Sequence, residues 1–212
     1  MKVINLRNVL LLNFLIHGTC IAQNFEGKIT YKTTYKSKVP NVTDEVFTQM
    51  MGSALEYSYK HGNYRTTSNG TFLQWQLYVH KDNKLYTKFS SSPSILWNDG
   101  AVNPDSVLKS ELNKNVIEIL GNQCDELVLT CKTGVQKYYF SAKYKLDPAL
   151  FQNHKFGNFY EYVSKSKALP LRIVIDNVQF AMDATASSIE AQKISDEIFV
   201  LPANATLEKS PY

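Results

Sequence analysis

The sequence predicts a mainly β protein of the α+β class: a curved antiparallel sheet or half-open β-barrel with a few short helices over one side. Three observations support this fold class. Apolar and polar residues alternate with a period of two in most segments, clusters of Gly, Asn and Asp separate these segments, and the chain contains 13 Tyr and 11 Phe. Such alternation is typical of half-buried strands, the separating residues favour hairpin turns, and aromatic residues favour strands.

The first predicted strand covers residues 25–35. Ile29 and Tyr31 lie on its apolar face, with lysine and threonine on the other. Residues 43–51 predict a short helix, because Thr43 can cap its start, acidic residues stand in its first turn and Gly52 can end it.

Four more strands are expected before residue 90, and turn-forming residues separate them: 55–60, 64–68, 71–80 and 84–89. The strand over 71–80 carries the longest uninterrupted apolar row of the chain, formed by Leu73, Trp75, Leu77 and Val79. Residues 90–104 contain several Pro, Gly and Asn residues and predict a loop.

The second half of the chain repeats this pattern. Asp147 and Pro148 predict a helix start, since aspartate caps helices and proline is favoured at the first helical position. The expected strands are 116–120, 124–131, 135–142, 171–179 and 181–189, with a second short helix over 158–167 and a last strand or extended tail ending at 199–202. No repeat or linker interrupts the pattern, which predicts one domain.

Residues 1–22 have the features of a cleavable signal peptide, and residues 23–212 are expected to form the single β-rich domain. Lys2 and Arg7 precede a short apolar run, and Ala22 supplies a small residue at the cleavage point. The apolar run is shorter than the roughly 20 residues that a membrane-spanning helix needs. We therefore expect export to the periplasm or beyond the cell, with no transmembrane span in the mature chain.

Two mature N-termini are compatible with this segment. Cleavage after Ala22 would leave Gln23 first. The alternative is a lipid anchor on Cys20, although His17 and Thr19 are not the residues that lipoprotein processing favours before the cysteine.

The charge balance argues against nucleic acid as a partner. Loss of Lys2 and Arg7 takes the 23 basic residues to 21, against 19 acidic ones. Nucleic-acid binding needs basic residues concentrated on one face, whereas the lysines here are scattered along alternating segments.

The sequence contains no recognisable catalytic or metal-binding motif, and we expect no enzyme activity, metal or cofactor. His61, His80 and His154 lack the paired spacing of zinc sites, and His61 and His154 are expected to be solvated in loops. No nucleophile elbow or phosphate-binding loop is present.

Cys124 and Cys131 are expected not to form a disulfide. The residues between them contain no turn former, so both cysteines are placed on one strand. Seven residues at about 3.3 Å each separate them by ~23 Å and point them to opposite faces. A disulfide requires Cα atoms within about 7 Å.

Several stretches resemble a group of small exported proteins of Bacteroidetes bacteria. They are Phe25-Glu26-Gly27-Lys28-Ile29 with Tyr31, Ile119-Leu120-Gly121-Asn122-Gln123-Cys124, Ala168-Leu169-Pro170-Leu171-Arg172-Ile173 and Val200-Leu201-Pro202-Ala203-Asn204-Ala205. The second is similar to the Ile-x-Gly-x-x-Cys segment of the GLPGLI family. Such proteins resemble the lipoprotein carriers LolA and LolB at the level of fold. The resemblance implies an incomplete barrel, helices over its opening and an apolar cavity for acyl chains.

The predicted function is that of an exported binding protein of the cell envelope, with an acyl chain, lipid or lipoprotein acyl chain in a half-barrel cavity. The cavity lining is expected to comprise Leu73, Trp75, Leu77, Val79, Ile29, Tyr31, Tyr138 and Phe140. A structural or protein-interaction domain with a filled core is the alternative, because small barrels usually have packed interiors. An enzyme of unrecognised type is the third possibility.

Overall fold

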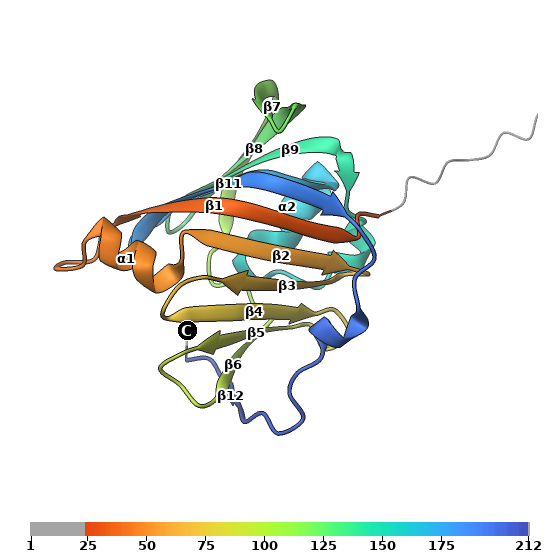
Figure 1. Ribbon diagram of the computed structural model, residues 1–212. Coiled ribbons are helices and arrows are strands. Elements are labelled where there is room, and N and C mark those ends of the chain that lie inside the picture. Colours follow the sequence, from red (N-terminus) through yellow and green to blue (C-terminus); the bar gives the residue numbers. More distant parts are fainter. Residues whose placement is uncertain (1–23, 212) are drawn as a thin grey trace, which may run out of the picture.

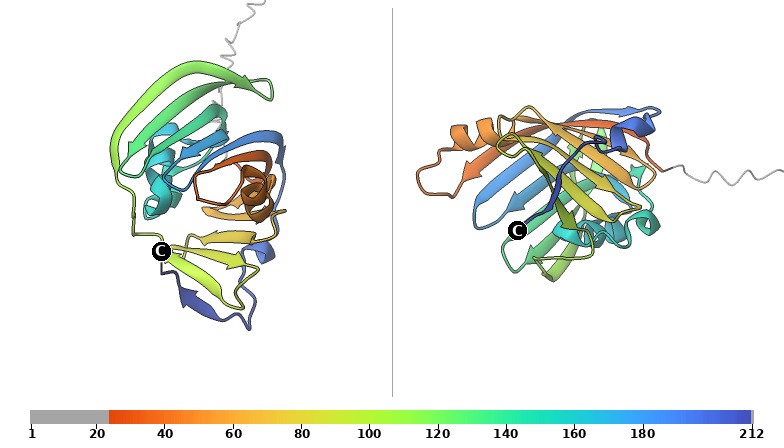
Figure 2. Two further views of the ribbon diagram at one scale, coloured as in Figure 1. Left: turned by 90° about the vertical axis from the view of Figure 1, so that its left-hand side faces the viewer. Right: turned by 90° about the horizontal axis from the view of Figure 1, so that it is seen from below.

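The computed structural model describes residues 24–211. The predicted signal peptide, Cys20 and Gln23 lie outside the described residues. The described chain forms a 12-stranded sheet in the order β12-β6-β5-β4-β3-β2-β1-β11-β10-β9-β8-β7 (Figure 1). The sheet is curved and open, with β12 and β7 at its edges, which confirms the predicted fold class (Figure 2).

The elements follow the chain in a simple order. They are β1 (Gly27–Ser37), α1 (Asp44–Met51), β2 (Ala54–Lys60), β3 (Asn63–Ser68), β4 (Leu73–Val79), β5 (Lys84–Phe89), β6 (Ile95–Asp99), β7 (Val107–Ile119), β8 (Asn122–Cys131), β9 (Val135–Lys145), the 3-10 helices η1 (Pro148–Phe151) and η2 (Phe156–Asn158), α2 (Phe159–Ser166), β10 (Ala168–Asp176), β11 (Phe180–Ala191), η3 (Asp196–Phe199) and β12 (Leu207–Lys209). Neighbouring strands pair antiparallel except β12, which runs parallel to β6.

Local turn and cap chemistry explains several of these boundaries. His61 and Gly62 join β2 to β3 with φ values of 47° and 81°, as a two-residue type I′ hairpin requires. The Thr43 side chain accepts a hydrogen bond from the Val46 N–H and caps α1, and Gly52 ends that helix with φ 100°. The Asp147 side chain caps η1 ahead of Pro148.

The main core lies on the concave side of the sheet, which we call the inner face. Residues 148–166, here called the insert, contain η1, η2 and α2 and cover part of this face (Figure 2). Tyr162 and Val163 of α2 are buried in the main core, and the Tyr162 ring stacks 4.3 Å from that of Tyr138 on β9. Burial of such apolar surface is the main stabilising contribution.

A smaller core lies on the opposite, outer face. Residues 192–209, here called the C-terminal segment, cross the outer side of the sheet and end in β12. Ile194 and Phe199 of this segment pack on Leu77, Tyr86 and Ile95. The sheet is therefore buried on both faces where the C-terminal segment covers it.

Three strands differ from the sequence-based expectation. β12 lies beyond the last strand or extended tail expected to end at 199–202, where the chain forms η3. β6 lies within residues 90–104, which were predicted to be a loop, and β7 begins at Val107 rather than near residue 116. Residues 108–116 of β7 are exposed on both faces, so they carry no alternation to indicate a strand. Among the described residues, no helix has the length and apolar character needed to cross a membrane.

Candidate functional site

The eight residues predicted to line one cavity do not lie together. Ile29 and Tyr31 on β1, with Tyr138 and Phe140 on β9, belong to the main core. Ile29 and Tyr31 are fully buried, and the Tyr31 hydroxyl donates a hydrogen bond of 2.6 Å to the carbonyl of Pro170. These four side chains face the interior of the half-barrel.

Three of the other four residues lie on the opposite side of the sheet. Trp75, Leu77 and Val79 of β4 pack in the smaller core beneath the C-terminal segment. The prediction that this row faces the half-barrel interior is therefore wrong. The prediction fails because β4 is buried on both faces, so an apolar row on this strand need not face the interior. Tyr78, not Leu77, enters the main core.

Leu73 is separated from that row by a change of register. The β4–β5 pairing shifts between Leu73 and Trp75, so Leu73 pairs with Phe89 while Leu77 pairs with Tyr86. A bulge of this kind moves the side chains beyond it to the other face. Alternation along β5 therefore places Leu73 on the inner face.

An aromatic cluster fills the inner face beneath the insert. The His154 ring stacks on Tyr78 with centroids 3.9 Å apart and lies 4.8 Å from the Phe159 ring. Its Nε2 shares a hydrogen bond of 2.8 Å with the Tyr64 hydroxyl, whereas Nδ1 has no partner. Burial lowers the pKa of His154 from 6.5 to about 3, so the ring is neutral at physiological pH.

The expectation that His154 is solvated in a loop is wrong, because only 1% of the residue is exposed. In the sequence His154 follows Phe151 and precedes Phe156 and Phe159. These three rings pack in or against the main core, so the insert lies on the sheet and His154 is buried with it. That local density of aromatic residues was the sequence signal for a docked segment.

The inner face is less completely covered toward α1. Ile173 on β10 and Met182 on β11 pack against the main core but remain partly exposed, as does Tyr57 on β2. The pairing of Ile173 with Tyr138 and of Met182 with Tyr35 places both side chains on the inner face. This end of the half-barrel therefore carries apolar side chains that are only half-buried.

α1 closes this end only loosely. None of its residues is buried. Its Phe47 ring lies 5.3 Å from Tyr35 and 5.2 Å from Phe180, in an aromatic trio at the end of β1 and β11. The end of the helix is held by main-chain hydrogen bonds from Thr71 to Gln49 and from Phe72 to Met50.

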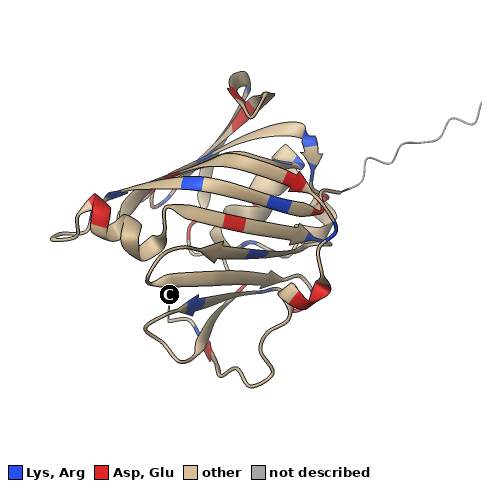
Figure 3. Ribbon diagram, in the orientation of Figure 1, with Lys and Arg blue, Asp and Glu red and all other residues tan. Residues whose placement is uncertain are grey.

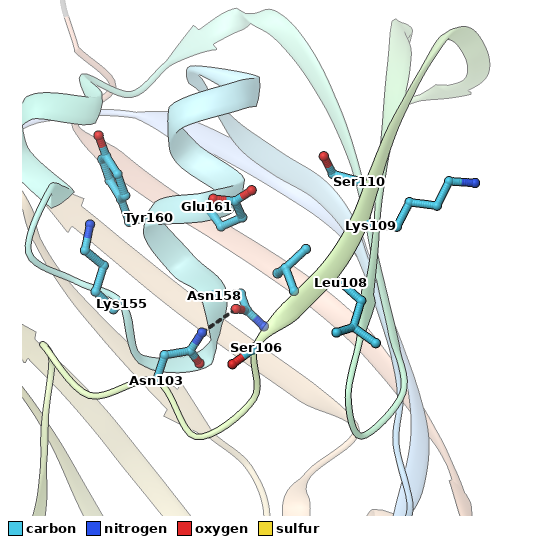
Figure 4. Close-up of a pocket in the computed structure, with 10 residues that line it drawn as sticks. Asn103, Ser106, Leu108, Lys109, Ser110, Lys155, Asn158, Tyr160 and Glu161 are labelled. Carbon is cyan, nitrogen blue, oxygen red and sulfur yellow. Dashed lines mark hydrogen bonds between the residues drawn. The ribbon is translucent and has the colours of Figure 1, made fainter.

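An open crevice of about 480 Å³ separates the start of β7 from the insert (Figure 4). Its lining is mostly polar: Asn103, Ser106, Val107, Leu108, Lys109, Ser110, Lys155, Asn158, Tyr160 and Glu161. The Asn103 amide donates a hydrogen bond of 2.7 Å to Oδ1 of Asn158, which ties the loop before β7 to the insert. The crevice borders the main core at Val107 and Tyr160, but its mostly polar lining does not suit an acyl chain.

The two cysteines of the described chain are free, which confirms the prediction that they are not bonded to each other. They lie near opposite ends of β8. Both nevertheless belong to the main core, so the expectation that they point to opposite faces is wrong. Pairing of β8 with β7 is irregular between Asn113 and Ile117, opposite Cys124. Burial raises the pKa of Cys131 to about 11, which keeps it as an unreactive thiol.

The charged residues are interspersed over the outer face of the sheet. Figure 3 shows basic and acidic positions on neighbouring strands rather than one sign gathered together. Lys28 lies 2.8 Å from Glu56, and Arg172 forms two hydrogen bonds to Asp183. Within residues 24–211, no group of three or more His, Cys, Asp or Glu side chains is arranged to hold a metal ion.

Solved structures similar to this chain include the following three, all at low identity. An uncharacterized conserved protein from Thermus thermophilus has 7% identity and a TM-score of 0.43, with 87% of this chain and 91% of that one covered. PNGF-II has 13% identity and a TM-score of 0.49; the match covers 88% of this chain but only 32% of PNGF-II. A LolA superfamily protein from Nitrosomonas europaea has 10% identity and a TM-score of 0.37, with 84% and 91% covered.

No known family model and no curated protein sequence matches the chain. Membership of the GLPGLI family therefore stays a prediction from the short stretches quoted above.

Proposed function

We propose that the protein is an exported binding protein that holds an apolar chain, such as an acyl chain or lipid, against the inner face of its half-barrel. One observation carries the proposal: Tyr57, Ile173 and Met182 leave apolar surface partly exposed on the concave side, next to a core that is otherwise buried. Exposed apolar surface within a concave site is typical of ligand-binding proteins. The protein is then a binding protein and not an enzyme.

The same face offers a polar group to one end of such a ligand. Thr33 pairs with Ala184 on β11 and is 3% exposed, and its hydroxyl has no hydrogen-bond partner. A buried polar group without a partner is costly, so a carboxylate or hydroxyl that reached Thr33 would gain a hydrogen bond. On this ground we propose an amphipathic ligand, whose polar end would have to displace the side chains that cover Thr33.

Burial of an acyl chain supplies enough free energy for useful affinity. Each methylene removed from water contributes about 0.8 kcal/mol, so a dozen contribute roughly 9–10 kcal/mol before the costs of association.

A second candidate is a structural or protein-interaction domain with a filled interior. The aromatic cluster of Tyr64, Tyr78, His154 and Phe159 favours it, because these rings occupy the inner face beneath the insert. The two candidates differ at Ile173 and Met182, where the first requires space and the second does not.

Met182→Trp tests this difference. If there is space beside Met182, the larger ring is accommodated, the free energy of unfolding changes by less than about 1 kcal/mol, and uptake of a fluorescent fatty acid falls. Overpacking of a filled core instead costs typically 1–3 kcal/mol. Denaturant unfolding and fatty-acid fluorescence are measured on the same preparations.

Ala181→Trp is the matched control. Ala181 is the neighbouring residue on β11 and pairs with Lys36, whose side chain is 79% exposed, so its side chain faces outward. This variant should retain wild-type uptake. A destabilised Met182→Trp protein, together with no fatty-acid uptake by the wild type, would favour the filled domain.

We further propose that the mature protein begins at Gln23 and carries no lipid. The proposal is supported by Ala22 and by the unfavourable His17 and Thr19 before Cys20. Intact-mass measurement on protein from its native host should give the mass of residues 23–212. A mass showing an acylated Cys20 at the N-terminus would establish the lipid-anchored alternative.

A further inference from the structure

The free edge of β7 is the most exposed stretch of the sheet. β7 ends the strand order and pairs only with β8, and all of its residues from 108 to 116 are exposed. Natural proteins usually protect such an edge with charged side chains, bulges, a proline, a short strand or a covering segment. β7 is 13 residues long and contains no proline; its lysines and its register shifts at Val107/Lys109 and Asn113/Ile117 limit pairing, but no strand covers the edge within the described residues. It therefore offers a row of main-chain N–H and C=O groups that no strand of the described chain uses.

The polar crevice follows this free edge. Lys109 pairs with Thr130 and Ser110 pairs with Leu129, which places their side chains on opposite faces of the sheet. Both nevertheless line the same crevice. In Figure 4 the Ser110 side chain points toward the insert and the Lys109 side chain points away from it, so the crevice lies between the start of β7 and the insert, beside the unpaired edge of the strand. The insert forms its far wall with Lys155, Tyr160 and Glu161 (Figure 4).

The charges of the crevice leave one cation without an acidic partner. Lys109 lies 2.7 Å from Glu111, and Glu161 lies 3.3 Å from Lys165. The Nζ atom of Lys155 lies 3.7 Å from the ring centroid of Tyr160, and no carboxylate of the described chain lies within ion-pair distance of it. An incoming carboxylate would complete this site at modest desolvation cost, because the crevice is open to water.

We propose that the crevice binds an extended polypeptide segment, which adds to β7 as a further strand and places an acidic side chain against Lys155. Strand addition to an exposed sheet edge uses main-chain hydrogen bonds for affinity and flanking side chains for selectivity. This partner differs in chemistry and in position from the apolar ligand of the inner face. The two proposals therefore stand or fall separately.

The probe is a fluorescein-labelled octapeptide of alternating Thr and Val with one central Glu, chosen because these residues favour strands. We expect saturable binding by fluorescence anisotropy. Backbone amide signals of residues 107–111 should shift in ¹⁵N NMR spectra, and their hydrogen exchange should slow. The same octapeptide with alternate amides N-methylated along one edge keeps its side chains but loses its main-chain donors, and it should bind at least about tenfold more weakly.

Lys155→Glu should weaken binding of the acidic octapeptide at least about fivefold and reduce the preference for Glu over Gln at its centre. Lys81→Glu makes the same charge change on an exposed lysine in the β4–β5 turn and should leave binding unchanged. Thermal unfolding of both variants checks that the fold is retained.

Three results would overturn the proposal. They are unchanged β7 amides at millimolar peptide, equal affinity for the N-methylated octapeptide, and a β7-paired dimer of this chain in sedimentation experiments without peptide. Loss of fatty-acid uptake in Met182→Trp with peptide binding intact would confirm that the two sites are separate.

Discussion

Leu77→Ala is expected to lower the free energy of unfolding by about 2–5 kcal/mol, the range for a buried large-to-small change. Leu77 is fully buried and packs against Tyr86 and Ile95 of the sheet and against Ile194 and Phe199 of the C-terminal segment. Removal of the side chain leaves a cavity between the sheet and that segment. Because Leu77 lies on the outer face, fatty-acid uptake by the folded fraction should not change.

Leu207→Ala is the matched control, since the same substitution is made on β12, where Leu207 is 43% exposed. It should cost less than about 1 kcal/mol. Denaturant unfolding with a constant m value measures both effects. A Leu77→Ala protein as stable as the control, with altered fatty-acid uptake, would place Leu77 at the ligand site and contradict the assignment of two cores.

A second large effect is expected from pH. The pKa of His154 falls from 6.5 to about 3 on folding, because burial disfavours the charged ring. Between these pH values the unfolded chain binds a proton that the folded chain does not. Stability is therefore full above about pH 6.5 and decreases as pH falls toward 3, by on the order of 4–5 kcal/mol from this residue.

The double variant His154→Phe with Tyr64→Phe isolates this contribution. It removes both partners of the 2.8 Å hydrogen bond, so no buried hydroxyl is left unpaired, and it keeps the stacked rings. Urea unfolding between pH 3.5 and 7.5 should show a shallower loss of stability in the double variant. Parallel curves for the two proteins would mean that His154 is hydrated or protonated in the folded state.

Local patterns predicted most of the fold. Alternation indicated β1 and β4, and turn residues such as Gly62 located hairpin connections. Thr43 and Asp147 cap α1 and η1 as expected, because capping depends on a few neighbouring atoms.

Features that depend on distant segments could not be predicted in the same way. The C-terminal segment returns to cover Trp75 and Leu77, and periodicity cannot show which of two buried faces is the concave one. The register shift that separates Leu73 from this row has no residue signature of its own. β7 was missed over residues 107–115 because its exposure on both faces removes the alternation.

The candidate site was predicted only in part, for the same reason. Ile29, Tyr31, Tyr138 and Phe140 lie on the inner face, whereas the partly exposed Ile173 and Met182 were not singled out. Their strands alternate like the others, and only the limited cover provided by α1 distinguishes them. The burial of His154 likewise follows from the docking of the insert onto the sheet.

The position of an apolar ligand is tested most directly by methyl NMR during a titration with dodecanoate. We expect saturable shifts of the Ile173 δ-methyl and Met182 ε-methyl signals, because both groups lie on the inner face, and unchanged methyl signals from Ile194 and Ile198 of the smaller core. No saturable shift, or shifts confined to Ile194 and Ile198, would contradict a ligand site on the inner face of the half-barrel.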